Sequence, residues 1–127
     1  MSGEEWATNA RAGVHVPFPR ASDLTVRHYG SGQWCVIEAV GEIDIQGVPL
    51  LQHHLSDVPS HLVFDLSRVT FMDASGLGVM SASLRVAIRS GGSVRIVGAS
   101  SQIGSMLAQT GLDRAMATFP TLEEAVA

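Results

Sequence analysis

A serine close to an aspartate, at the point where an apolar segment gives way to glycines, is the feature of this sequence best suited to chemistry. Residues 71–78 read Phe-Met-Asp-Ala-Ser-Gly-Leu-Gly, and a helical pattern follows them. A serine at such a strand-to-helix turn can cap the helix through its side-chain oxygen. The free N–H groups of the first helical turn favour negative charge. Ser75 is therefore a candidate site for a phosphate.

Enzyme chemistry has little support in the residues around Ser75. The Gly-x-Ser-x-Gly frame of a hydrolase elbow is missing, because position 73 is Asp. A catalytic pair of Asp44 and Asp73 would lack a nucleophile with its base. All eight basic residues are Arg, so a Schiff-base lysine and a lysine-containing phosphate loop are excluded. We expect a protein that is not an enzyme.

Composition limits the other classes. The chain has 127 residues, which suits one domain, and a net charge of −4, which disfavours nucleic acid as a partner. No apolar run approaches the roughly 18–20 residues that cross a bilayer, so we expect a cytoplasmic protein without membrane insertion. Cys35 is predicted to be a buried, inert thiol. The five histidines show no ligand spacing, and His53 and His54 are predicted to lie on the solvated surface; we expect no metal site and no cofactor.

The elements that would position Ser75 can be predicted from periodicity. Residues 1–22 are expected to form a flexible tail, and residues 24–29 and 34–43 form a hairpin. Helices are predicted over 46–57, over 75–90, after Ser100 and after Thr121, with Gly111 ending the third. Short strands are predicted at 62–66, 69–72, 94–97 and 115–119. The fold class is α/β: a single domain with a mixed β-sheet, an N-terminal hairpin, packed helices and parallel pairing among the later strands.

The long helix that follows Ser75 presents three predicted faces. Leu77, Met80, Leu84, Ala87 and Ile88 share one face, which we assign to the core, and Ser81, Arg85 and Arg89 form a polar stripe beside it. A third line, roughly opposite the core, holds Ser75, Val79, Ala82 and Val86. This line is predicted to be a docking surface for a partner. The alternative is that another element of the chain covers it.

Residues 73–78 (Asp73, Ala74, Ser75, Gly76, Leu77 and Gly78) resemble the phosphorylation loop of STAS-domain proteins, the bacterial anti-sigma factor antagonists. Val40-Gly41-Glu42-Ile43-Asp44 is similar to a second recurrent segment of that family. Gly91-Gly92 with the strand after it, and Thr110-Gly111-Leu112, repeat the family's order of elements. The resemblance runs from about Asp23 to the end, which implies a STAS domain over 23–127.

The resemblance implies a partner-switching function. Ser75 would be the phosphoacceptor, and Asp73 would orient its hydroxyl, although Asp also commonly serves only as a turn former. Glu42 and Asp44 would lie near the loop on the partner face, or be ordinary surface carboxylates. The unmodified protein would bind an anti-sigma factor serine kinase and release the sigma factor. Phosphorylation would add roughly −1.5 to −2 charge and block binding, and a phosphatase is a further expected partner.

Two alternatives remain open from the sequence. The chain could be a STAS subunit of a signalling assembly or of a lipid-transport complex. It could also be a small nucleotide-binding protein that uses the loop at 73–78, a reading weakened by the lack of lysine and of a second phosphate motif.

Overall fold

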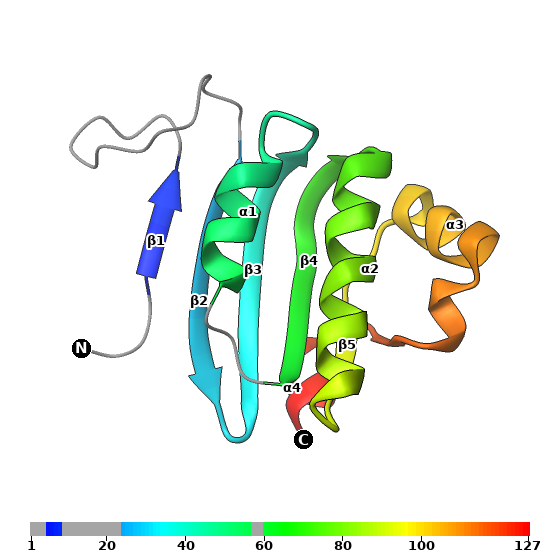
Figure 1. Ribbon diagram of the computed structural model, residues 1–127. Coiled ribbons are helices and arrows are strands. Elements are labelled where there is room, and N and C mark those ends of the chain that lie inside the picture. Colours follow the sequence, from blue (N-terminus) through cyan, green and yellow to red (C-terminus); the bar gives the residue numbers. More distant parts are fainter. Residues whose placement is uncertain (1–4, 9–23, 57–59) are drawn as a thin grey trace.

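The computed structural model describes residues 5–8, 24–56 and 60–127. Within these ranges the strands form one sheet in the order β1-β2-β3-β4-β5-β6 (Figure 1). The strands are β1 (Glu5–Thr8), β2 (Thr25–Ser31), β3 (Trp34–Ile43), β4 (His61–Met72), β5 (Ser93–Val97) and β6 (Ala117–Phe119). The helices are α1 (Val48–Leu55), α2 (Ala74–Arg89), α3 (Ser101–Thr110), the 3₁₀-helix η1 (Leu112–Arg114) and α4 (Leu122–Val126).

The sheet is mixed, as the sequence predicted. β1, β2 and β3 pair antiparallel, and β3, β4, β5 and β6 pair parallel. Each parallel connection passes through a helix, because the chain must return to the start of the next strand. As a result β3 and β4 end, and α1 and α2 begin, at the same edge of the sheet, the upper edge in Figure 1.

Hydrophobic residues lie on both faces of the sheet. On the face covered by α1 and α2, Leu62 and Phe64 of β4 belong to the main core. The intervening Val63 points to the other face, as strand alternation requires, and joins a smaller cluster with Trp34 and with Ala125 of α4. Arg95 packs against this cluster, with its guanidinium carbon 4.2 Å from the Trp34 ring centroid.

Strand β4 is one twelve-residue strand where the sequence predicted two short ones. The exposed pair Ser67 and Arg68 interrupts its apolar pattern. Pairing with β3 nevertheless continues past them, because β3 absorbs the irregularity through register shifts between Glu38 and Val40 and between Gly41 and Glu42.

The expected N-terminal tail, residues 1–22, falls mostly outside the described residues. Within it Glu5–Thr8 form β1, a strand that the sequence analysis did not predict, with Glu5 opposite His28 of β2. Four residues are too few to show periodicity, so their pairing could not be read locally.

The predictions about the exposure of His54 and Ile88 are wrong. His54 is only 3% exposed, not solvated, and its Nδ1 lies 2.7 Å from Nδ1 of His28 on β2. Ile88 is 58% exposed, not part of the core face of α2. Met80, Leu84 and Ala87 are buried as predicted, and so is Cys35, whose thiol has its pKa raised by burial. In the described part of the chain, no helix is long and apolar enough to span a bilayer.

Candidate functional site

Asp73 starts helix α2. Its backbone is extended, and its carboxylate Oδ1 accepts a hydrogen bond from the N–H of Ser75 at 2.9 Å. This is the geometry of an N-cap residue. Ser75 lies inside the first turn, so the prediction that its own side chain caps the helix is wrong. The two residues differ in role because only Asp73 has the non-helical backbone that a cap requires.

The Ser75 hydroxyl donates a hydrogen bond to the same Asp73 oxygen. This bond is the largest cause of the lowered pKa of Asp73, and the N–H groups of Ser75, Gly76 and Ile45 add to it. A carboxylate with a lowered pKa is a poor general base. Asp73 therefore acts here by holding the hydroxyl in one orientation, and both side chains remain half-buried rather than enclosed.

The other residues of the loop differ in how closely they pack against the rest of the protein. A Cβ on Gly76 would lie 2.6 Å from Met72 Cγ and 2.7 Å from Ile43 Cγ2, so the start of α2 approaches the sheet only because residue 76 is glycine. A Cβ on Gly78 would meet nothing within 4 Å. Leu77 packs at the border of the core, and Ala74 is exposed.

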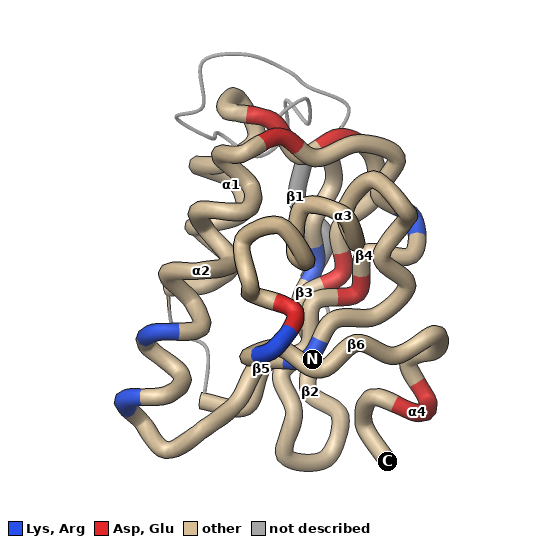
Figure 2. Tube along the Cα trace, turned by 90° about the vertical axis from the view of Figure 1, so that its right-hand side faces the viewer, with Lys and Arg blue, Asp and Glu red and all other residues tan. Residues whose placement is uncertain are grey.

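The end of β3 is brought next to this loop, as expected. The N–H of Asp73 donates to the carbonyl of Ile43 at 3.0 Å, which ties the two segments together. Asp44 accepts hydrogen bonds from the N–H groups of Gln46 (3.1 Å) and Gly47 (3.0 Å), so it shapes the turn before α1. Glu42 is exposed, opposite Phe71 in the sheet register. Figure 2 shows acidic positions at this end of the molecule, with others beside β4 and in α4.

Two exposed apolar residues at this end were missed by the sequence analysis. Phe71 is 44% exposed and Ile45 is 69% exposed. Strand alternation could have found Phe71, because its neighbour Met72 is fully buried and the two point to opposite faces. Ile45 follows the end of a strand and carries no such signal.

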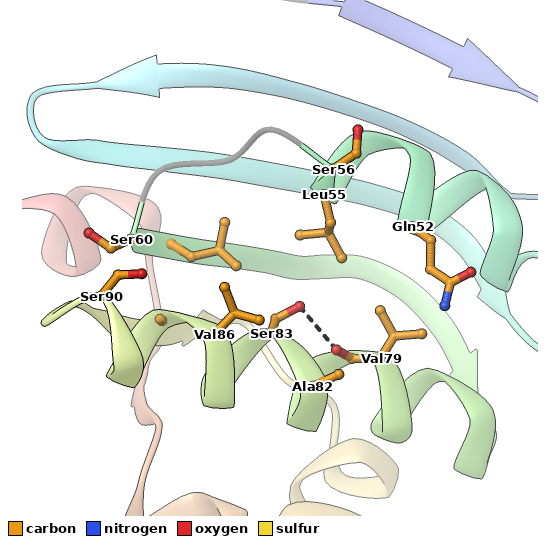
Figure 3. A pocket seen from close by; sticks show the side chains of 11 residues that line it. Gln52, Leu55, Ser56, Ser60, Val79, Ala82, Ser83, Val86 and Ser90 are labelled. Carbon is orange, nitrogen blue, oxygen red and sulfur yellow. Dashed lines mark hydrogen bonds between the residues drawn. The ribbon is translucent and has the colours of Figure 1, made fainter.

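The predicted docking stripe on α2 is only partly exposed. Val79 is 7% exposed and belongs to the core, so the prediction that it lies opposite the core is wrong. Helix α1 packs beside α2 on this side, which periodicity within one helix cannot reveal. Ala82 and Val86 are exposed, and with Val79 they border a cavity of about 220 Å³ between the two helices (Figure 3).

No group of three or more His, Cys, Asp or Glu side chains is placed to hold a metal ion within residues 24–56 and 60–127.

Comparisons with known proteins show the family and the fold that this chain resembles. The family model described as "STAS domain" matches residues 25–125. An anti-sigma factor antagonist from Mycobacterium paratuberculosis is 27% identical, with a TM-score of 0.72 over 88% of this chain and 95% of that chain. A putative anti-sigma factor antagonist from Thermotoga maritima is 23% identical, with a TM-score of 0.71 over 77% of this chain and 88% of that one.

The anti-sigma factor antagonist SpoIIAA in its unphosphorylated form is 21% identical, with a TM-score of 0.70 over 80% of this chain and 92% of that chain. At 21–23% identity the likeness of the second and third structures concerns the fold alone. No curated protein sequence matches the chain.

Proposed function

Because the chain belongs to the STAS-domain family, we propose that it is an anti-sigma factor antagonist. Its unmodified form binds an anti-sigma factor that is a serine kinase, and the sigma factor is released in the cytoplasm. Phosphorylation of Ser75 ends the binding, and a phosphatase restores it. The observation that carries this proposal is the Ser75 hydroxyl held by Asp73 at the accessible N-terminus of α2.

Ser75 is better placed than neighbouring hydroxyls to accept a phosphoryl group. Ser83 donates its hydroxyl proton to the carbonyl of Val79 at 3.0 Å, and Thr70 donates to the carbonyl of Gly41 at 3.3 Å. Both hydroxyls therefore direct their protons to backbone carbonyls, which cannot move aside without disturbing the fold. The Ser75 hydroxyl instead donates to a side chain, the Asp73 carboxylate, which holds it in one orientation and can rotate aside without disturbing the backbone.

A phosphate on Ser75 would alter this site locally. The hydroxyl would lose its donated hydrogen bond to Asp73, and a group of roughly −1.5 to −2 charge would stand beside that carboxylate. The N–H groups of the first turn of α2 would partly offset the repulsion. The fold therefore need not change.

A bound partner would respond more strongly than the fold. The proposed partner face consists of Glu42 and Asp44, the exposed Ile45 and Phe71, and the exposed Ala82 and Val86 along α2. Val79 was predicted from the sequence to lie on this face; because Val79 is buried, the face proposed here includes the exposed Ile45 and Phe71 instead. Burying apolar side chains beside a phosphate dianion would require that group to lose water without gaining a cation, which is unfavourable.

Affinity capture with three baits tests this function. The parent chain and Ser75→Ala should both capture an ATP-dependent serine kinase, and Ser75→Glu should capture less of it. The captured kinase with ATP should add the mass of one phosphate to the parent and none to Ser75→Ala. Phosphate on Ser81, Ser83 or Thr70 with Ser75 unmodified would refute the assignment. Capture of transporter subunits by all three baits would instead support a role in a lipid-transport complex.

A further inference from the structure

The cavity between α1 and α2 lies along the C-terminal half of α1 and along α2 from Val79 to its end. Its volume is about 220 Å³, and its floor is Leu62 of β4. Figure 3 shows side chains of both helices pointing into it, among them Leu55 from α1 and Val79 and Val86 from α2. Ser75 and Ser90 are fifteen residues apart along α2, or about 22 Å at 1.5 Å per residue. Val79, which also lines the cavity, is only four residues from Ser75, or about 6 Å, so the cavity extends along α2 from near the loop to the C-terminal end of the helix. Ala82 and Val86 belong both to this lining and to the proposed partner face.

Among the residues that the structure describes, the lining of the cavity is uncharged: six of the eleven lining residues are apolar, and the others are four serines and Gln52. Two of its serines are already engaged, since Ser83 donates to the Val79 carbonyl at 3.0 Å and Ser56 donates to the His53 carbonyl at 3.0 Å. Their hydroxyls offer little to a polar ligand. An engineered apolar cavity of about 150 Å³ holds benzene, so 220 Å³ suits an aliphatic chain of roughly eight or nine carbons.

Basic residues lie in the part of α2 that forms one side of the cavity. Neither α1 nor α2 contains an acidic residue, although the whole chain has a net charge of −4. Arg85 and Arg89 are exposed in the last two turns of α2, where Figure 2 shows basic positions. Arg89 is three residues after Val86 and seven after Ala82, so it lies on the same side of the helix as these lining residues.

We propose that this cavity binds a medium-chain carboxylate. The aliphatic tail lies between α1 and α2 over Leu62, and the carboxylate stays at the surface beside Arg89, with Arg85 adding to the positive field. Such a ligand matches both observations, the uncharged interior and the basic residues of α2. A cationic amphiphile or a small anion without a tail matches only one of them.

NMR titration of the full chain with octanoate tests the site. Backbone amides of residues 79–90 should shift saturably with octanoate, and not with acetate, which lacks the tail. Octyltrimethylammonium, of equal chain length but opposite charge, should bind more weakly. Arg89→Gln should weaken octanoate binding roughly two- to fivefold, the range for one exposed charge pair, and leave octanol binding unchanged. Arg68→Gln is the matched control, because Arg68 is also exposed but lies on β4.

Filling the cavity gives an independent test. Ala82 is exposed and lines the cavity, so Ala82→Phe should fold and lose octanoate binding. Three results would overturn the proposal: equal binding of octanoate and octyltrimethylammonium, unchanged octanoate binding in folded Ala82→Phe, or shifts of residues 79–90 caused only by anionic vesicles. The comparison of ligands on the parent chain decides the question even if Ala82→Phe fails to fold.

Discussion

Acidification should destabilise the protein through one buried imidazole. His54 is 3% exposed, and burial, aided by the nearby His28 and His53, lowers its pKa to about 4 from the ordinary value of 6.5. Its Nδ1 shares one hydrogen bond with Nδ1 of His28 at 2.7 Å, which requires that one of the two atoms carry the proton. A proton added to the accepting Nδ1 would set two N–H groups against each other and break this hydrogen bond.

The direction and the size of the stability change follow from the difference in proton binding between the folded and the unfolded chain. The unfolded chain binds a proton at His54 below pH 6.5, whereas the folded chain resists it until about pH 4, so stability is greatest above pH 6.5 and falls as the pH is lowered. With these two values the loss of unfolding free energy between pH 7.5 and pH 5 is about 2 kcal/mol. Protonation of Asp73 affects stability only at lower pH values than these, because the pKa of its carboxyl group is lowered from 3.8.

Urea unfolding at pH 7.5, 6.5, 5.5 and 5.0 measures this loss. In His54→Leu, which keeps an apolar side chain in the buried position, the dependence on pH over this range should nearly vanish. A parent chain equally stable at pH 7.5 and pH 5 would refute the reasoning. An unchanged pH dependence in folded His54→Leu would assign the effect to other groups.

Two further predictions use matched pairs of substitutions. Val79→Asp should lower the unfolding free energy by more than about 2 kcal/mol, because it buries a charge. Val86→Asp, at a 56% exposed position, should melt like the parent and weaken kinase capture. Equal melting temperatures of the two variants would contradict the assigned burial. Gly76→Ala should lower the unfolding free energy by about 1–3 kcal/mol, because the added methyl group meets Met72. Gly78→Ala has open space around it and should raise the unfolding free energy by about 0.5–1 kcal/mol, because Ala is the better helix former. Thermal unfolding that ranks the two variants the other way would refute the packing argument.

The sequence was informative where local chemistry decides the structure. The caps at Ser100 and Thr121 were predicted, and both side chains accept the expected backbone N–H. The cap of α2 was misassigned because Asp73 and Ser75 are both good cap residues, and only the backbone conformation separates them. Local patterns thus locate the loop but leave the roles of its two polar side chains to the structure.

Errors arose where a distant element decides the environment. Helical periodicity fixed the angle at which Val79 points, but the burial of Val79 depends on α1 packing alongside α2. The same applies to His54, a polar residue that is buried because β2 places His28 against it. Glu5–Thr8 are a strand only because β2 offers an edge. Single-sequence patterns contain no information about such neighbours.

The most direct test of the proposed switch compares binding and stability at position 75. Calorimetry on the same preparations should show Ser75→Ala binding the kinase at least as tightly as the parent, Ser75→Glu binding more weakly, and phosphorylated parent not binding. Ser75→Glu should unfold close to the parent, because the helix N-terminus favours its charge by about 0.3–1 kcal/mol and the neighbouring Asp73 opposes it. Binding should therefore change while stability does not. Full affinity in Ser75→Glu, together with equal affinity of the phosphorylated and unmodified parent, would contradict the account.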